Sequence, residues 1–303
     1  MGNSESTLTD NDTTLYNTDK NEFYSLRYNL VPSFKNNSYE TIDISFFGDD
    51  LEELPRYVDF RKDFVDILNI RSFAFNPIAC VSYLLQYSLL KNELSVFPPS
   101  LVFIYKNCLF YKGHSELLTF ETIFKSIRTS GFIIENEFRT NKTNVLEGNI
   151  TEKMYEKAHP YKYIKVFNVE RNIDTIKYIL FNKYPILVGF SVYYNFSRVS
   201  NNLWMPNNEI EKNIGGIGGV LVGYIEERRL FIMAQTYGTS FGQNGYVLVP
   251  YDYIINDNLT FDMYVLEVDK VRIKDYFNQT KPIINIDNKP QNDNKGFFSN
   301  LFS

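Results

Sequence analysis

The stretch that decides the fold reads Gly215-Gly216-Ile217-Gly218-Gly219-Val220-Leu221-Val222-Gly223-Tyr224, a glycine-rich start followed by an apolar run. Further apolar runs lie at 185–193, 230–234 and 246–250, and the last two are separated by turn residues, namely Gly238, Gly242, Asn244 and Gly245. Short apolar runs with turn residues between them are typical of antiparallel hairpins. The sequence therefore predicts an antiparallel β unit in the second half of the chain.

Helical spacing dominates the chain before this unit. A first helix is predicted from Pro77 to Leu94, because apolar residues recur there at helical intervals and proline suits the first helical position. Asn76 is then expected to be its N-cap. Further helices are predicted at about 117–130, ending at Gly131, and at about 173–182. Helices followed by strands indicate an α+β fold with two lobes.

The glycine-rich stretch and the segments after it resemble the C-terminal lobe of papain-family cysteine peptidases. That family has Gly-Gly-His before a strand ending in Val-Gly-Tyr, then Asn-Ser-Trp-Gly, Trp-Gly and Gly-Tyr. This chain has Gly215-Gly216-Ile217, Gly223-Tyr224, Gly238-Thr239-Ser240-Phe241-Gly242 and Gly245-Tyr246. Residues 54–61, Leu-Pro-Arg-Tyr-Val-Asp-Phe-Arg, look like the start of the mature enzyme. The resemblance covers about residues 53–256 and implies a papain-like fold, with a helical lobe and an antiparallel β-barrel-like lobe.

When the chain is aligned with the family's pattern, every catalytic position holds a residue other than the family's catalytic one. The resemblance places Asn76 at the nucleophile, Ile217 at the histidine, Gln235 at the asparagine that orients the histidine, and Ile70 at the glutamine that stabilises the oxyanion. It also implies a set of residues around the binding cleft: Ser72, Phe73, Leu117 beside Glu116, Gly216 and Tyr237. Tyr237 and Phe241 stand where the family has tryptophans, and we expect them to shield their neighbourhood.

The chemistry of the family needs a thiolate, an imidazole that activates it, and donors aimed at the oxyanion. Asparagine is no such nucleophile, and isoleucine cannot exchange a proton. We therefore expect a pseudopeptidase. Ile217 makes the cleft floor apolar, which suits either a partner's hydrophobic side chain or a closed groove.

The remaining thiols and imidazoles offer an alternative. Cys80 lies about one helical turn (~6 Å) beyond Asn76. An active peptidase with displaced chemistry would pair it with His114 or His159, the chain's two histidines. We expect instead that Cys80 and Cys108 are small buried hydrophobes. We expect no cofactor, and no metal site, because neither histidine has ligand spacing to cysteines or carboxylates.

The composition limits the possible partners and the cellular location of the protein. The net charge is −5, and no cluster of lysine and arginine forms a stripe, so nucleic acid is not an expected partner. Two cysteines exclude a secreted disulfide framework, and no apolar run reaches the ~18 residues of a spanning helix. The sequence predicts an intracellular, cytoplasmic or virion-interior protein that is not secreted.

The two ends differ from the core. Residues 1–50 are a polar arm that we expect along the surface, residues 51–271 are the papain-like core, and residues 272–303 are a flexible tail. Within the core, the helical lobe is expected at about 70–145 and the β lobe at about 146–271 plus 53–68. The start, Met1-Gly2-Asn3-Ser4-Glu5-Ser6, fits the pattern for myristoylation of Gly2. One acyl chain binds membranes marginally, so a second contact from the apolar tip, 297–302, would be needed.

The leading functional hypothesis is a catalytically inactive papain-like protein that binds protein or peptide, as a virion or membrane-associated component. The alternative enzyme is the displaced cysteine peptidase described above. A third reading is a purely architectural protein in which the arm and the tail wrap neighbours and the groove is filled.

Overall fold

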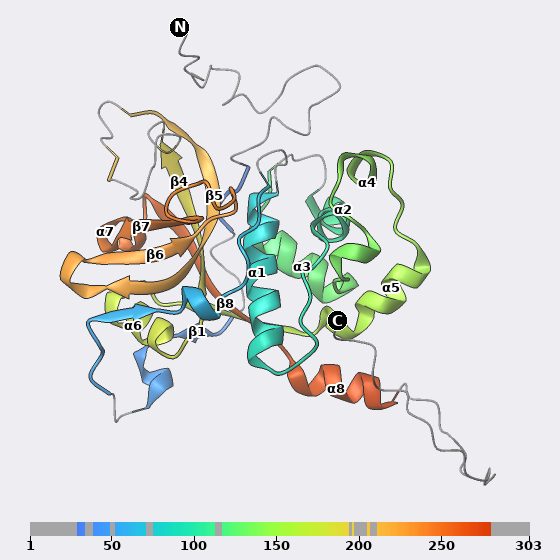
Figure 1. Cartoon of the computed structure of the whole chain (residues 1–303), viewed down its shortest axis with the longest axis horizontal. Coiled ribbons are helices and arrows are strands. Elements are labelled where there is room, and N and C mark those ends of the chain that lie inside the picture. Colours follow the sequence, from blue (N-terminus) through green and yellow to red (C-terminus); the bar gives the residue numbers. More distant parts are fainter. Residues whose placement is uncertain are drawn as a thin grey trace, which may run out of the picture.

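Helix α1, Asn76–Lys91, stands between a β-sheet and a group of shorter helices (Figure 1). The computed structural model describes residues 29–33, 39–48, 52–70, 75–112, 117–193, 196, 205–206 and 211–279. The other helices are α2 Leu101–Lys112, α3 Phe120–Ser130, α4 Lys142–Leu146, α5 Glu152–Ala158, α6 Ile173–Phe181, α7 Tyr251–Ile255 and α8 Lys270–Gln279. The strands are β1 Thr41–Ile42, β2 Tyr57–Asp59, β3 Ile164–Val169, β4 Ile186–Tyr193, β5 Asn213–Ile225, β6 Leu230–Ala234, β7 Tyr246–Pro250 and β8 Thr260–Val268.

The strands form one sheet in the order β1-β3-β8-β4-β5-β6-β7, and β2 pairs with β5 outside this path. The β1–β3 pair is parallel, and the other pairs are antiparallel. The long strand β5 is the centre of this lobe because it pairs with β4, β6 and β2. The expected antiparallel β unit is therefore present, and β3 and β8 extend it.

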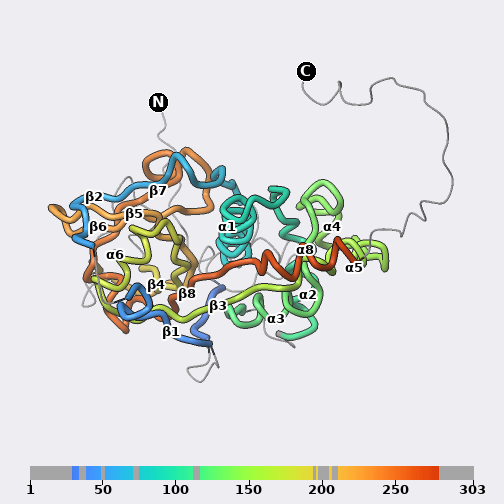
Figure 2. The backbone as a smooth tube through the Cα atoms, turned by 90° about the horizontal axis from the view of Figure 1, so that it is seen from below, coloured from blue at the N-terminus to red at the C-terminus, as the bar shows by residue number. Residues whose placement is uncertain are grey.

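Figure 2 shows the same two-lobed arrangement from below, with the strands on one side of α1 and α2 to α5 on the other. Nearly every side chain of α1 is buried. A helix that is apolar on all sides belongs inside a protein, where it is packed from every direction. Helix α1 is packed in this way, between β5 and β8 on one side and α2 on the other. The two-lobed α+β fold expected from the sequence is the fold observed.

The predicted helices are present with shifted ends. Helix α1 ends at Lys91, three residues before the predicted Leu94. Helix α3 starts at Phe120, because the hydroxyl of Thr119 accepts the backbone N–H of Thr122 and caps it there. Its C-cap is Gly131, where φ is +73° and a Cβ atom would lie 1.9 Å from the backbone oxygen of Ala158. Only glycine fits that turn.

The lobe boundaries differ from the predicted ones at two places. Helix α5 lies beyond residue 146 but packs on α2, where the Tyr155 hydroxyl donates to Asn107 Oδ1 at 2.9 Å and the Tyr155 ring packs on Phe103. The helical lobe therefore extends past its predicted end. The chain also continues as helix α8 through Gln279, so the expected flexible tail does not begin at residue 272.

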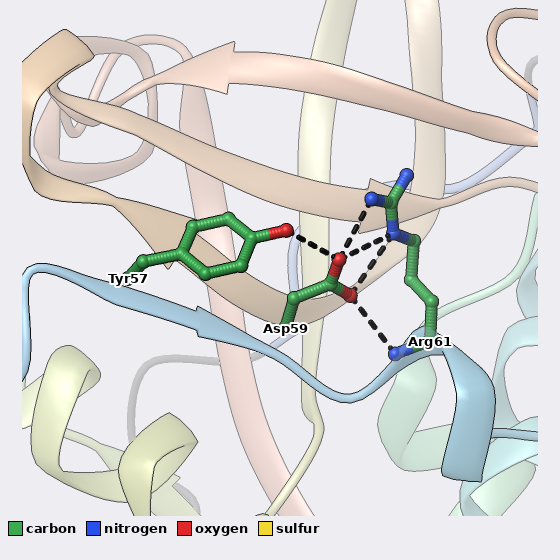
Figure 3. A network of polar contacts seen from close by, with 3 residues as sticks. All are labelled: Tyr57, Asp59 and Arg61. Carbon is green, nitrogen blue, oxygen red and sulfur yellow. Dashed lines mark hydrogen bonds and ion pairs between the residues drawn. The ribbon is translucent and has the colours of Figure 1, made fainter.

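Strand β2 is anchored by a compact polar network (Figure 3). Asp59 accepts hydrogen bonds from the Tyr57 hydroxyl at 2.7 Å and from the Arg61 guanidinium at 2.7 to 3.1 Å. Burial raises the pKa of Asp59, but the bonds from Arg61 and Tyr57 lower it more, so the net pKa lies below its usual value. The guanidinium also lies over the Tyr246 ring, 5.5 Å from its centroid, which ties β2 to β7.

Among the described residues, no helix has both the length and the apolar character needed to cross a bilayer. Gly2 and the apolar tip 297–302 lie outside the described residues.

Candidate functional site at the seam between the lobes

Asn76 is the first residue of α1, and its side chain crosses the seam to strand β5. Its Oδ1 accepts the backbone N–H of Gly218 at 2.5 Å, and its Nδ2 donates to the Gly218 carbonyl at 3.2 Å and to Thr236 Oγ1 at 3.0 Å. The prediction that this side chain caps α1 is wrong, since the N-cap is Phe75 and no side chain caps that end. The carboxamide instead joins the two lobes, and its residue is 1% exposed.

The missing side chain of Gly218 leaves the space in which Asn76 reaches the backbone of β5. A Cβ atom there would lie 3.1 Å from Cys80 Sγ, 3.2 Å from the Phe120 ring and 3.4 Å from Asn76 Oδ1. Side chains from α1 and α3 therefore approach the backbone of β5 closely. The glycine-rich start of β5 is explained by this packing, since a larger residue at 218 would push the lobes apart.

The other residues aligned with catalytic positions are also buried. Ile217 is 0% exposed and pairs with Phe190 of β4. Gln235 is 0% exposed, and its Nε2 and Oε1 have no hydrogen-bond partner among the described residues. Ile70 is buried, and its N–H donates to the Thr236 carbonyl at 2.9 Å. The seam thus holds amide and apolar groups at these four positions.

Residues 29–33, Asn-Leu-Val-Pro-Ser, run through the seam, and we call them the cleft segment. The Leu30 N–H donates to the Gly216 carbonyl at 3.1 Å. On the other lobe, the Leu118 N–H donates to the Asn29 carbonyl and the Leu118 carbonyl accepts the Val31 N–H, each at 2.9 Å. The expectation that the arm lies along the surface is wrong for Asn29, Leu30 and Ser33, which are buried, whereas Pro32 is exposed.

The far end of the cleft segment is held by Asp262 of β8. Its carboxylate accepts the Ser33 N–H at 3.1 Å and the Ser33 hydroxyl at 2.9 Å. Burial raises the pKa of Asp262 to about 6, although the bonds from Ser33 act in the opposite direction. Glu121 raises this pKa further, and Arg171 lowers it. The cleft segment is therefore bound by backbone pairing in its middle and by a charge-assisted contact at its end.

Glycines also make room for the cleft segment and for the aromatic rings around it. A Cβ atom at Gly216 would lie 2.3 Å from the Leu30 carbonyl oxygen, and one at Gly189 would lie 2.6 Å from the Phe261 ring. Next to these, Phe120 and Phe124 of α3 meet Tyr264 of β8 edge to face, with centroids 6.1 and 5.2 Å apart. The seam is filled by apolar rings and by the protein's own backbone.

The residues predicted to line the cleft lie in different places in the structure. Ser72 and Phe73 lie outside the described residues. Gly216 lies in the seam, where the cleft segment covers it. The backbone that pairs with this segment on the helical lobe belongs to Leu118, one residue after the predicted Leu117. Tyr237 packs against Phe241, with centroids 5.2 Å apart, and both rings contact Phe196, which agrees with a shielding role.

The thiols and the described histidine have other partners. Cys80 is fully buried, burial raises its pKa, and its Sγ lies 3.8 Å from Asn76 Nδ2. His159 Nε2 lies 2.7 Å from Lys162 Nζ, and its ring packs on Tyr276. Burial and Lys162 lower the pKa of His159. Cys108 is also buried, and His114 lies outside the described residues. No group of three or more potential metal ligands occurs in the described part of the chain.

Sequence reasoning missed the cleft segment and Asp262. The segment Leu30-Val31-Pro32 is a short apolar island in a polar arm, which is a weak signal by itself. Asp262 alternates with apolar residues in a strand, where an acidic residue ordinarily faces solvent. Their partnership joins positions 229 residues apart, and no local pattern encodes it.

Comparisons with known proteins agree with this geometry at the level of the fold. No family model matches the chain. Over 125 residues the chain is 30% identical to an uncharacterized peptidase C1-like protein of Acanthamoeba polyphaga mimivirus, a match that covers 37% of this chain and 40% of that protein. The matched region thus spans less than half the length of this viral relative.

Solved structures of cysteine peptidases superimpose on most of the chain. Xylellain, a cysteine protease from Xylella fastidiosa, matches with a TM-score of 0.72 and 22% identity over 82% of this chain and 98% of its own. Procathepsin L2 from the larval midgut of Tenebrio molitor matches with a TM-score of 0.64 and 12% identity over 80% of this chain and 78% of its own. Procathepsin B from Trypanosoma congolense matches with a TM-score of 0.61 and 11% identity over 81% of this chain and 88% of its own. The chain therefore has the α+β fold of the papain-like cysteine peptidases.

Proposed function

We propose that this chain is a catalytically inactive papain-like protein whose seam between the lobes serves structure and protein binding. The observation that carries the proposal is the Asn76 carboxamide, which sits at the start of α1 and is hydrogen-bonded to both backbone polar groups of Gly218 and to Thr236. Through these bonds the Asn76 side chain links the two lobes, and the family resemblance assigns this position to the nucleophile.

The chemistry of the surrounding groups supports inactivity. A cysteine peptidase needs a thiolate whose pKa is lowered by an imidazolium or a helix N-terminus. Burial has the opposite effect on Cys80 and raises its pKa. At the position assigned to the histidine, Ile217 has no proton to exchange. Removing one member of such a catalytic unit already abolishes most of the rate enhancement, because its members act together.

The filled seam supports a binding or structural role. The cleft segment covers the backbone of Gly216 and Leu118, and a peptide would need those same groups to pair with the lobes. A protein partner therefore either displaces residues 29–33 or binds an outer face of the lobes. We propose protein or peptide as the class of partner, in a virion or membrane-associated setting, and the negative net charge of −5 argues against nucleic acid.

The proposal is tested by measuring peptide hydrolysis by the purified full chain across a mixed peptide library, beside the double variant Cys80→Ser with Cys108→Ser. We expect no cleavage by either protein. Cleavage by the natural sequence that disappears in the double variant would overturn the proposal and would favour a cysteine peptidase with displaced catalytic groups. Cleavage by both proteins at equal rates identifies a contaminating protease, which inhibitor profiling and repurification remove before the comparison is repeated.

A further inference from the structure

A pocket lies beside α8, at the end of the helical lobe. Its volume is about 320 Å³, close to the lower end of the range for small ligand sites. We call it the α8 pocket, and its lining residues come from the loop after α1, from the turn before β3 and from α8: Leu94, Ser95, Tyr161, Ile273, Lys274, Phe277 and Asn278. In Figure 1, α8 lies beyond the lower end of α1, away from the sheet.

The wall of the α8 pocket is built on aromatic rings. The Tyr161 ring meets Phe97 edge to face with centroids 5.0 Å apart, and it lies 5.2 Å from Phe132 and 6.2 Å from Phe277. Aromatic rings arranged in this way accept further rings edge to face or offset. The pocket is therefore suited to apolar, above all aromatic, side chains.

Exposed apolar side chains gather in the same part of the chain. The described residues include ten large hydrophobic side chains that are exposed. Four of them line the pocket or lie within four residues of a lining residue: Leu90, Val96, Val271 and Phe277. Val271 is 66% exposed on the first turn of α8. Of the four, Phe277 itself lines the pocket, and an exposed apolar side chain in a pocket marks a surface that an apolar partner can cover.

The chain itself supplies an apolar segment next to this surface. Twenty-four residues, 280–303, follow Gln279, and Asn278 at the end of α8 is a lining residue. Residues 297–302 read Phe-Phe-Ser-Asn-Leu-Phe, with three phenylalanines and a leucine. The spacer before them, 280–296, contains no aromatic residue, and beside three isoleucines at 283, 284 and 286 it carries lysines, aspartates, asparagines and prolines.

The length of the spacer suits a contact within one chain. A coil of 17 residues, the length of 280–296, has an end-to-end distance of roughly 23 Å. A tether of that kind gives an effective concentration on the order of 1 mM, so even a weak pocket is largely occupied. The same segment on a second molecule would need a millimolar protein solution to compete.

We propose that residues 297–302 of this chain bind in the α8 pocket and cover it. The test uses a thiol placed on the pocket wall by Lys274→Cys. Cys80 and Cys108 are buried, so a maleimide reacts with the new thiol in the folded full chain. The comparison protein carries Lys274→Cys and serines at the four apolar tail positions: Phe297→Ser, Phe298→Ser, Leu301→Ser and Phe302→Ser.

We expect labelling of the thiol at position 274 to be about tenfold faster in the protein with the four serines. That factor corresponds to an effective concentration on the order of 1 mM and a dissociation constant on the order of 0.1 mM. A synthetic peptide of residues 295–303 should slow the labelling of the serine protein again. Asn278→Cys repeats the measurement at a second wall position.

The matched control is Glu227→Cys, an exposed position on the turn between β5 and β6, where the four serines should leave the rate unchanged. Equal rates with and without the four serines at both 274 and 278 would overturn the proposal. Protection that rises with protein concentration would overturn it as well, because a second molecule would then be filling the pocket.

Discussion

The Asn76 carboxamide is one of the side chains that connect the two lobes at the seam. Asn76 satisfies the N–H and the carbonyl of Gly218 together, and those two groups lie in the buried part of β5. A buried backbone group without a partner costs the free energy of its desolvation. The role of Asn76 is therefore better described as pairing two backbone groups across the seam than as capping a helix.

Replacing Asn76 with alanine should lower the free energy of unfolding by about 3 kcal/mol, since Gly218 and Thr236 lose their partners in a dry site. Urea unfolding followed by circular dichroism measures the change. Asn258→Ala, at an exposed position, is the control and should change it by less than about 0.5 kcal/mol. An equally small effect at position 76 would contradict the role assigned to this side chain.

Asp262 makes the stability depend on pH in a direction unusual for a carboxyl group. Burial raises its pKa in the folded protein to about 6, above the usual 3.8 of an aspartate, so the folded state binds the proton more tightly than the unfolded state does. The free energy of unfolding should therefore fall by up to about 3 kcal/mol as the pH rises from 4 to 7. Asp262→Asn removes this titration and still offers an oxygen to Ser33.

The measurement is urea unfolding of both proteins over that pH range. The advantage of Asp262→Asn over the natural protein should grow with pH. Asp252→Asn, at an exposed carboxylate near Arg229, serves as the control for a surface charge. Parallel pH profiles for the natural protein and Asp262→Asn would show that Asp262 titrates normally.

At the residue scale, sequence and structure disagree where long-range contacts compete with local rules. The sequence pattern Asn-Pro before an apolar helix favours a capping asparagine, and α1 does begin there. The partner that overrides this rule is Gly218, 142 residues away. The pattern on its own contains nothing about that partner. The family resemblance places Asn76 opposite position 217, and the hydrogen bonds in the structure are made to the next residue, Gly218.

At the scale of elements, the sequence predicts best where apolar spacing is regular. Helices α1, α3 and α6 and strands β4, β6 and β7 lie close to their predicted ranges. Helix α2 was missed because the run Leu101-Val102-Phe103-Ile104 is continuously apolar, and such a run fits a buried helix or a buried strand equally well. Strand β8 was missed for a related reason, since Asp262 interrupts its apolar pattern.

The cleft segment behaves as an element of its own because its bonds come from both lobes. Leu30→Asp should release it, since the new carboxylate would replace a side chain that is 2% exposed. Hydrogen exchange should then accelerate at the amides of Leu30, Val31 and Leu118, whose N–H groups the segment pairs. Amides of β6 should keep their protection. Leu109→Asp, at an exposed position of α2, is the control. Unchanged exchange at Leu118 would contradict the pairing.

At the scale of the whole molecule, the lobes are joined at several points along α1. Besides Asn76, the Tyr83 hydroxyl accepts the Leu68 N–H at 2.7 Å and donates to the Gln235 carbonyl at 3.1 Å. Further along the helix, Ser88 Oγ accepts the Val268 N–H of β8 at 2.9 Å. These contacts link the helix to three parts of the β lobe. We expect the two lobes to unfold together in one transition.

Tyr83→Phe tests this coupling. Loss of the hydroxyl removes the partner of the half-buried Leu68 N–H and of the buried Gln235 carbonyl, and should lower the free energy of unfolding by about 1–3 kcal/mol. Circular dichroism reports on the whole fold, and reaction of Cys80 and Cys108 with a thiol reagent reports on the helical lobe. In the natural protein the two probes should give one common urea midpoint. In the variant they should again agree with each other, at a lower urea concentration. Separate midpoints would show that the lobes unfold independently.

The most direct test of the proposed inactivity is the reaction of the full chain with a thiol-directed peptidyl inhibitor, followed by intact mass spectrometry. Burial raises the pKa of Cys80, and the family resemblance assigns the nucleophile position to Asn76, so the proposal predicts an unchanged mass. An adduct on every molecule that is lost on Cys80→Ser or Cys108→Ser would contradict the account and identify a working cysteine peptidase.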